Sequence, residues 1–443
     1  MASEDKEYVL KRASELDVKF VRLWFTDILG SLKSFAITVE DLEEALERGK
    51  AFDGSSIEGF ARIDESDMIA MPDPSTFVVL PWRPRERATA RMLCDVLTPH
   101  GRPFEGDPRW VLKRNLQRAT EMGYTYYVGP EIEYFYFKSS EGIPQPLDQG
   151  GYFDLTPLDA ASDLRRETVL ALEEMGIGVE YSHHEVAPSQ HEIDLRYTDA
   201  LTMADSTMTY RLVVKEVAMR NQVYATFMPK PLYGHNGSGM HVHQSLFKEG
   251  KNAFYDPQSP NHLSNTARQF LAGLLEHARE LTAVTNQWVN SYKRIVPGYE
   301  APCYLSWALR NRSDLIRVPE YKPGKEESTR IEYRSPDPAC NPYLVFSVML
   351  AAGLDGIKRQ LEPPPPVEEN VFEMTDAERK ARGIGVLPGS LDEAIQVMEG
   401  SKLVRECLGD HVFDSFVQNK KIEWSQYRSQ VTDYELKRYL PIL

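Results

Sequence analysis

The spacing of apolar and polar positions divides the chain into a small sheet-rich part and a larger mixed part. Residues 1–15 have the spacing of an amphipathic helix, and a capping box of Thr38 and Asp41 predicts a helix that ends at Gly49. The runs typical of strands are 19–25, 32–37, 77–82 and 90–96, the first two joined as a hairpin. The Gly- and Ser-rich segment 52–60 predicts a loop. We expect a first domain, a small sheet with a helix, over residues 1–103.

Longer helical patterns alternate with strands in the rest of the chain. Asp107 and Pro108 open a helix in the favoured way, with an N-cap carboxylate before a proline at the first helical position. The other predicted helices are 162–176, 201–221, 265–286 and one from Pro342, and the predicted strands are 129–137, a run from Val179, and 224–228. This alternation indicates a second domain of α/β type over residues 104–443. Its proline-rich segment 362–369 predicts a stiff surface linker.

One predicted strand carries two carboxylates on an otherwise aromatic face. Because strand side chains alternate, Glu131, Glu133, Phe135 and Phe137 point to the same side. The Cα atoms of the two acids are ~6.6 Å apart. At that range two like charges repel by roughly 2–3 kcal/mol at an effective dielectric constant near 20. Half-buried, such a pair needs a raised pKa, a basic partner or a metal ion.

Two further strands repeat this arrangement. The residues that share a face are His241, His243 and Ser245 in one strand, and Arg330, Glu332 and Arg334 in the other. Any single strand of this kind is most simply an amphipathic strand with its polar side in water. Three of them together favour a polar cavity floored by a sheet.

The segment 183–192 adds two carboxylates, Glu185 and Glu192. Pro188 interrupts any strand there, so we expect a strand end and a loop, and His184 and His191 receive no assigned role. The candidate metal ligands are Glu131, Glu133, Glu185, Glu192, His241 and Glu332. Such an oxygen-rich set suits Mg²⁺ or Mn²⁺ better than Zn²⁺. Five carboxylates exceed the need of one ion, which indicates at least two.

Composition excludes several classes of protein. The chain has 443 residues and a net charge of −15, which argues against a general nucleic-acid or anionic-membrane binder. Its four cysteines lack CxxC spacing and are expected to be reduced thiols of a cytoplasmic protein. The N-terminus lacks the apolar core of a signal peptide, and the longest apolar run, 343–354, is too short to cross a bilayer.

A cluster of arginines stands out in this acidic chain. They are Arg310, Arg312, Arg317, Arg330 and Arg334. Arginine pairs bidentately with phosphate or carboxylate, and we expect surface ion pairs with Asp314, Glu326 and Glu327 to explain some members of the cluster. The glycine loop 236–239 allows a ligand to approach the backbone closely. Metal ligands, arginines and this loop together indicate phosphoryl transfer.

Seven motifs then identify a resemblance that spans nearly the whole chain. They are FDGSSIEGF (52–60), GPEIEYF (129–135), HHEVAPSQHEI (183–193), KPLYGHNGSGMHVHQSL (230–246), RIVPGYEAP (294–302), ALRNRSDLIR (308–317) and RIEYRSPDPACNPYL (330–344). In this order they resemble the type I glutamine synthetases. The resemblance implies an α+β chain with a β-grasp domain followed by a catalytic domain, in which antiparallel strands form a funnel-shaped site.

The resemblance also implies a role for individual residues. One metal ion is expected at Glu133, Glu185 and Glu192, and another at Glu131, His241 and Glu332. The residues implied for ATP are Glu180, His243, Ser245, Arg312, Arg317 and Arg330. Those implied for glutamate are Asn236, Gly237, Arg294, Glu300 and Arg334. Those implied for ammonium are Asp53, Ser56, Tyr152, Glu185 and Glu300.

The implied reaction has two steps. The side-chain carboxylate of glutamate attacks the γ-phosphate of ATP, and ammonia then displaces phosphate from the γ-glutamyl phosphate. Arg312 is expected to face the transferred group, Glu300 to cover the intermediate from a mobile lid (294–300), and Asp53 to accept a proton from ammonium. In the family Asp53 reaches a neighbouring subunit, so a dodecamer of two hexameric rings is implied.

The chain departs from one subgroup of the family. Segment 358–366 lacks the tyrosine that this subgroup adenylylates, so we expect no such switch. Arg62 resembles the feedback position of the other subgroup, but pairing with Asp64 or Glu65 is an equal explanation. Two alternatives to glutamine synthesis remain: a ligase that joins glutamate to a larger amine, and an inactive relative. The acids at two positions of the ammonium pocket, Asp53 and Glu300, favour ammonia, and the six intact metal ligands favour an active enzyme.

Overall fold

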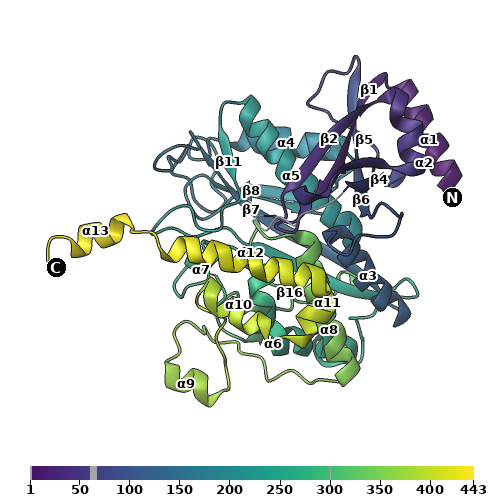
Figure 1. Ribbon diagram of the computed structural model, residues 1–443. Coiled ribbons are helices and arrows are strands. Elements are labelled where there is room, and N and C mark those ends of the chain that lie inside the picture. Colours follow the sequence, from purple (N-terminus) through teal and green to yellow (C-terminus); the bar gives the residue numbers. More distant parts are fainter. Residues whose placement is uncertain (1, 60–66, 300) are drawn as a thin grey trace.

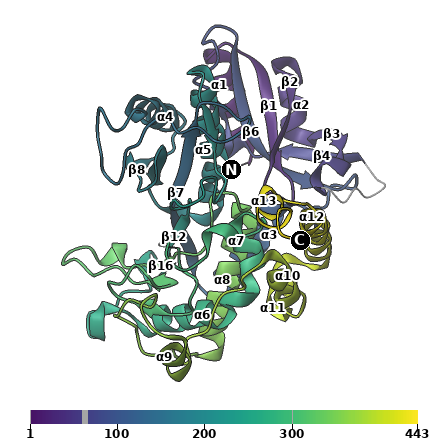
Figure 2. The same ribbon diagram turned by 90° about the vertical axis from the view of Figure 1, so that its left-hand side faces the viewer.

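The computed structural model describes residues 2–59, 67–299 and 301–443, and it separates a small N-terminal domain from a larger one (Figures 1 and 2). The strands of the small domain are β1 (Val18–Thr26), β2 (Leu32–Thr38), β3 (Lys50–Asp53), β4 (Asp67–Pro72), β5 (Val78–Val79) and β6 (Ala88–Leu97). They form a mixed sheet in the order β2-β1-β6-β4-β3, with β5 beside β6. Only β1 and β6 pair in parallel among these described strands.

Two helices, α1 (Ala2–Glu15) and α2 (Leu42–Arg48), bury apolar side chains such as Val9 and Ala45 against this sheet. The predicted capping box is wrong: the Thr38 side chain makes no capping hydrogen bond, because a 3₁₀ turn, η1 (Val39–Asp41), precedes α2. The segment expected to be a loop from Phe52 is in part regular. It continues β3 and then forms the 3₁₀ helix η2 (Gly54–Ile57). Strand β4 was not predicted.

The large domain is built on one long sheet. Its strands are β7 (Thr125–Phe137), β8 (Val179–His184), β9 (Gln190–Leu195), β10 (Thr198–Asp199), β11 (Tyr224–Thr226), β12 (Met240–Lys248), β13 (Lys251–Asn252), β14 (Trp307–Ala308), β15 (Ile316–Arg317) and β16 (Ile331–Tyr333). The main order is β14-β15-β16-β12-β7-β9-β8. Apart from β14 with β15, the described pairs are antiparallel. The α/β interpretation of the second domain is therefore wrong, because alternating elements carry no information about pairing direction.

Helices cover the sheet and close the chain. They are α3 (Pro108–Glu121), α4 (Ser162–Glu174), α5 (Ala200–Arg220), α6 (Asn265–Thr285), α7 (Ser291–Arg294), α8 (Pro342–Arg359), α9 (Asp376–Ala381), α10 (Leu391–Glu399), α11 (Lys402–Leu408), α12 (Asp410–Arg428) and α13 (Asp433–Tyr439), with 3₁₀ turns η3 (Pro74–Thr76), η4 (Pro260–His262) and η5 (Glu326–Ser328). Helix α13 protrudes at the C-terminal end (Figure 1). None of the described helices combines the length and apolarity that a bilayer crossing requires.

A buried ionic network joins the two domains. Arg109, in the first turn of α3, is 3% exposed. Its guanidinium donates to both oxygens of Asp205 on α5, at 3.1 and 2.9 Å. It also donates to Asp95 at 2.6 Å and to Asp73 at 2.8 Å, both in the small domain. Tyr343 of α8 donates a hydrogen bond of 2.6 Å to Asp205. One cation thus connects three carboxylates across the domain boundary.

Helix α12 holds the loop that follows Asp53. The buried Glu58 carboxylate lies 2.6 Å from His411 Nε2 and accepts from Ser415 Oγ at 2.9 Å. Asn419 Nδ2 donates to the Glu58 carbonyl at 3.0 Å. Residues four apart share one face of a helix, so a single face of α12 anchors this loop.

Candidate functional site

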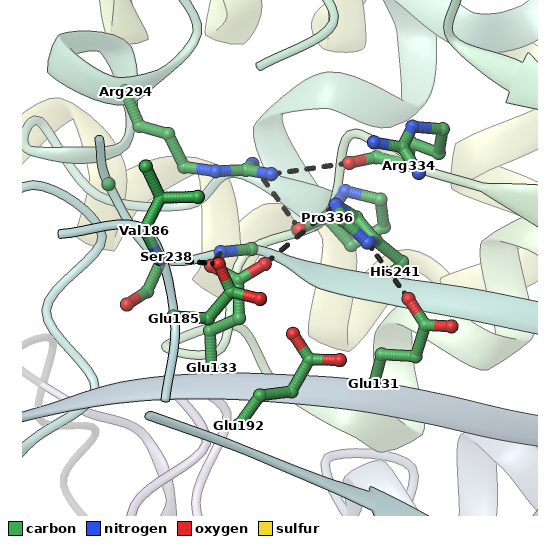
Figure 3. A network of polar contacts seen from close by, with 12 residues as sticks. Glu131, Glu133, Glu185, Val186, Glu192, Ser238, His241, Arg294, Arg334 and Pro336 are labelled. Atoms are coloured by element: carbon green, nitrogen blue, oxygen red, sulfur yellow. Dashed lines mark hydrogen bonds and ion pairs between the residues drawn. The ribbon is translucent and has the colours of Figure 1, made fainter. Parts of the chain in front are cut away.

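Strand register brings the predicted ligands together. The cross-strand pairs are His241 with Glu131, Glu133 with Glu192, and His243 with Glu332. Directly opposed side chains on one face of a sheet lie within contact distance of each other. Figure 3 shows Glu131, Glu133 and Glu192 pointing from the sheet toward the space below His241 and Arg294. Residues up to 201 positions apart in the chain, Glu131 and Glu332, therefore meet at one place.

Two cavities open on this face of the sheet. The larger has a volume of about 680 Å³, and the predicted residues that line it are Glu131, Glu133, Tyr152, Glu185, Glu192, Asn236, Gly237, His241, Arg294, Arg312, Arg317 and Arg334. The smaller has a volume of about 170 Å³, and the predicted residues that line it are Glu131, Glu180, His243, Ser245 and Arg330. Glu131 lines both cavities, so they are adjacent.

One side of the larger cavity, which we call the acid-rich half, holds Glu133, Glu185 and Glu192. Glu133 is 7% exposed, and its Oε2 accepts from Gln190 Nε2 at 2.8 Å and from the Gly239 amide at 3.0 Å. Burial and the charge of Glu185 raise the pKa of Glu133 well above its usual value. Burial and the neighbouring Asp194 raise the pKa of Glu192 in the same way. For Glu133, burial and repulsion by neighbouring acids outweigh the opposing charge of Arg294, and for Glu192 burial and neighbouring acids likewise disfavour the ionised form.

The other side, the ion-paired half, has Glu131 and His241 at the cavity wall and Glu332 buried next to them, lining neither cavity. Glu332 is fully buried, and its two oxygens accept hydrogen bonds from Arg317 and Arg334. Although burial opposes ionisation, Arg334 and the neighbouring histidines lower the pKa of Glu332 to about 2.

The negative charge of Glu131 is compensated by histidines and not by arginines. His243 Nδ1 accepts from Arg330 Nε at 3.1 Å, so its Nε2 carries a proton and donates to Glu131 at 2.7 Å. His241 Nδ1 lies 3.1 Å from the other oxygen of Glu131. Despite burial, these contacts lower the pKa of Glu131.

The donor set fits divalent cations. Ligand atoms that lie within 4.8 Å of one another include those of Glu131, His241 and Glu332, and those of Glu185 and Glu192 with His183. Asp194 joins Glu131 and Glu192 in a further group, and its Oδ1 is buried without a hydrogen-bond partner. Burial raises the pKa of Asp194 to about 7. Raised carboxyl pKa values and an unpartnered buried oxygen are what removal of a cation from such a site leaves behind.

Sequence reasoning missed two residues here, His183 and Asp194. Asp194 lies two positions after Glu192 on one strand, a spacing that we applied to Glu131 but not to this segment. We expected Glu192 in a loop because of Pro188, whereas the structure places it in β9. The turn around Pro188 is short enough that β8 and β9 pair as a hairpin.

The glycine loop packs against protein rather than standing open. A Cβ at Gly237 would lie 2.3 Å from the carbonyl oxygen of Pro229, and one at Gly239 would lie 2.5 Å from Arg294 Nη2. Arg294 is 3% exposed and donates to the Ser335 carbonyl at 2.7 Å. It also donates to the Arg334 carbonyl at 3.3 Å (Figure 3). The glycines therefore allow the arginine to reach the cavity wall.

The arginine cluster divides between site and surface. Arg312 and Arg317 line the larger cavity and Arg330 the smaller. Hydrogen bonding to Tyr152 raises the pKa of Arg312. Arg310 is exposed and pairs with Glu320 at 2.9 Å, an ion pair that we had not foreseen.

Two predicted residues, Asp53 and Ser56, line neither of these cavities. Asp53 and Ser56 belong to the small domain, and among the described residues no lining residue of either cavity precedes Tyr127. Glu300 and Arg62 fall outside the described residues. His184 and His191 are buried behind the site, where His184 Nε2 lies 3.1 Å from Asp148.

Comparison with known proteins shows which family the chain matches. Residues 17–99 match the family model "Glutamine synthetase, beta-Grasp domain", and residues 105–439 match "Glutamine synthetase, catalytic domain". Proteins named glutamine synthetase are 56% identical in Methanosarcina mazei, covering 99% of this chain and 98% of that protein, and 52% identical in Thermotoga maritima, covering 98% and 99%. A solved structure described as "GmaS/ADP complex-Conformation 1" has a TM-score of 0.89 at 32% identity, covering 98% of this chain and 99% of that one.

Proposed function

Because this chain belongs to the glutamine synthetase family and joins glutamate with ammonia to give glutamine, we propose that it does so through a γ-glutamyl phosphate formed from ATP. The observation that carries the proposal is the strand register, which gathers carboxylates, His241 and arginines around two adjacent cavities. The family uses divalent metal ions and ATP, and this chain has grouped His and Glu side chains suited to such ions.

The two adjacent cavities support separate binding sites for the two substrates. The smaller would take the nucleotide beside Glu180, His243, Ser245 and Arg330, and the larger would take glutamate at Asn236, Gly237, Arg294 and Arg334. The acid-rich half would hold one Mg²⁺ or Mn²⁺ ion and the ion-paired half another. When bound, these ions would neutralise charge on the phosphates of ATP. Arg312 and Arg317, at the wall of the larger cavity, would face the transferred phosphoryl group and reduce its negative charge.

The second step needs ammonia and a site free of water. Tyr152 and Glu185 line the cavity where the cation NH₄⁺ would gather. We propose that Asp53 accepts its proton, with Ser56 beside it, and that Glu300 covers the acyl phosphate from segment 294–300. Water must be excluded because it would hydrolyse this intermediate.

Isotope transfer tests the intermediate directly. Glutamate labelled with heavy oxygen in its side-chain carboxylate should transfer one labelled oxygen to the phosphate that is released. Mass spectrometry of that phosphate measures the transfer. Glutamine formed with unlabelled phosphate would overturn the acyl-phosphate route while leaving glutamine synthesis in place.

A second experiment determines which amine is the substrate. A phosphate-release assay with ammonium or putrescine as sole amine should show much faster turnover with ammonium, because acidic residues line the proposed pocket. Faster turnover with putrescine would favour the ligase for a larger amine. Phosphate release that requires neither glutamate nor amine would favour an inactive relative with residual ATP hydrolysis.

We further propose a homo-oligomer, a dodecamer of two hexameric rings, with sites shared between subunits. Asp53 and Ser56 support this, since neither is among the described residues that line the larger or the smaller cavity of its own chain. The C-terminal end supports it too, because Tyr434 is 67% and Leu440 77% exposed. Mixing inactive Asp53→Ala and Arg312→Ala subunits should restore part of the activity, because some sites then receive both native residues. No recovery in re-formed oligomers would overturn the shared site.

The remaining proposals concern organisation and control. We propose that the domains divide at 103 and 104 and that the protein is cytoplasmic, which its four buried free thiols support. We propose the non-adenylylated subgroup, since segment 358–366 contains no tyrosine. Glutamine feedback through Arg62 is tested by comparing inhibition by glutamine in the wild type and in Arg62→Ala.

A further inference from the structure

A lysine that contacts Tyr299, a lining residue of the larger cavity, is fixed to the start of the segment that precedes Glu300. Lys230 lies six residues before Asn236 of the glycine loop. Its amide donates to Asn290 Oδ1 at 2.7 Å, and Asn290 Nδ2 donates to the Lys230 carbonyl at 3.0 Å. Asn290 is the N-cap residue of α7, the short helix that leads into residues 295–299. The backbone of Lys230 is thereby tied to the base of that segment.

The side chain of Lys230 contacts the far end of the same segment. Its Nζ lies 3.7 Å from the centroid of the Tyr299 ring and donates to the His235 carbonyl. Tyr299 lines the larger cavity. A cation over a ring face is attracted by the ring quadrupole, and more strongly where water is partly excluded.

Lys230 has an unusual electrostatic environment for a lysine near the surface. Burial and the charge of Arg294 lower its pKa, and no acid among the described residues offsets these effects. Most partly buried lysines pair with a carboxylate. Here the ring of Tyr299 and the carbonyl of His235 take that place, so the ammonium joins the glycine loop to residues 295–299.

We propose that Lys230 is a positioning residue, which holds residues 295–299 over the cavity through the ring of Tyr299 and so keeps water from the activated glutamate. This inference rests on the proposed function. In the productive step ammonia bonds to the side-chain carbonyl carbon, the bond to the phosphate oxygen breaks with its electron pair, and the surplus proton passes to a carboxylate. Water attacking the same carbon returns glutamate and phosphate instead, so ATP is consumed without product.

Coupling between phosphate and glutamine measures this role. In the full-length enzyme with Mg²⁺, ATP and glutamate saturating and ammonium limiting, the wild type should release close to one phosphate for each glutamine. Lys230→Met and Tyr299→Leu should each raise phosphate release without glutamine by about three- to tenfold, the range expected for the loss of one cation–π contact. A purely structural role would lower both products together and leave their ratio unchanged.

Conservative variants supply the controls. Lys230→Arg keeps the cation and Tyr299→Phe keeps the ring, so both should remain coupled, and the double variant Lys230→Met/Tyr299→Leu should leak no more than either single variant. Full coupling in Tyr299→Leu, or equal leakage in Tyr299→Phe, would overturn the inference. Tyr299 is only partly buried, so its variants should fold even where Lys230→Met does not. A wild type that forms no glutamine would instead overturn the proposed function.

Discussion

The two halves of the larger cavity contain the same kind of residue in opposite electrostatic states. In the ion-paired half, Glu332 accepts hydrogen bonds from Arg317 and Arg334, and its pKa is lowered to about 2. In the acid-rich half, Glu133 and Glu192 face other acids, and their pKa values are raised. Glu332, Glu133 and Glu192 all lie in strands of one sheet, and all three are almost fully buried.

This difference shows that the protein itself neutralises one half and leaves the other to a cation. A buried carboxylate with two arginines is already neutralised, so its removal leaves uncompensated positive charge. A buried cluster of acids without a cation is destabilising until a metal ion or protons arrive. Substitutions of similar chemistry should therefore have opposite effects on the stability of the metal-free protein.

The largest effect is expected from Glu332→Ala. It leaves two arginines facing each other, and it should lower the free energy of unfolding by about 3–5 kcal/mol, as breaking a buried ion pair does. Glutamine synthesis should fall about a thousandfold, because the proposed metal ligand and the arginine positions are lost together. Urea denaturation and a glutamine assay measure the two quantities. Glu320→Ala, which breaks the exposed pair with Arg310, should change stability by less than about 1 kcal/mol.

The next effect is a contrast between Glu192→Gln and Glu131→Gln. Both remove one charge without changing size. Glu192→Gln should leave the metal-free protein as stable as the wild type or more so, because it relieves repulsion with Asp194. Glu131→Gln should lower the free energy of unfolding by about 1–3 kcal/mol, because His243 and His241 lose a charged partner. Equal losses of stability in denaturation of the two metal-free variants would refute the distinction between the halves.

A moderate effect is expected from pH. The raised pKa values, about 7 for Asp194, mean that the acid-rich half holds protons below neutral pH, and a divalent ion must displace them. Affinity for Mn²⁺ should therefore fall as the pH becomes more acidic, by about tenfold per pH unit for each proton displaced. Glu332, with a pKa of about 2, contributes nothing in this range. Calorimetry in two buffers of different ionisation enthalpy measures proton release, and binding without any release near neutral pH would contradict the raised values.

The smallest effect is expected from Asp194→Asn. If Asp194 acts as a charged neighbour of Glu192 and not as a ligand, Mn²⁺ binding should weaken only about tenfold. The pH at which half of the Mn²⁺ binding is lost should also decrease, since the variant lacks one titratable carboxyl group. A loss as large as that of Glu192→Gln would make Asp194 a ligand in its own right.

The face of each strand was predictable from the sequence, whereas the partners of each strand were not. Alternation alone placed Glu131 and Glu133 on one side, because a strand repeats every two residues. It could not show that Glu133 lies opposite Glu192 or that His243 lies opposite Glu332, since register between distant strands is set by packing of the whole sheet. The motifs supplied that grouping through the family resemblance. The roles of the individual residues stay predictions until the variants are measured.

Local signals failed where tertiary contacts compete with them. Thr38 has the sequence of a capping box, yet the chain enters α2 through a 3₁₀ turn and the threonine does not cap it. Pro188 suggested a strand end and a loop that included Glu192, yet it occupies a tight connection that returns Glu192 to the sheet. In both cases the propensity of a few residues was weaker than the pairing of the neighbouring strands.

The network around Arg109 limits how the small domain can be exchanged in protein engineering. Two of its three carboxylates, Asp73 and Asp95, come from the small domain, and the third, Asp205, comes from the large one. A chimera whose foreign N-terminal domain lacks Asp73 and Asp95 would leave the buried guanidinium of Arg109 without two of its carboxylate partners at the domain boundary. Transplantation between homologues should therefore succeed only when the incoming domain carries acids at the positions of Asp73 and Asp95, which meet Arg109 and Asp205 of the large domain.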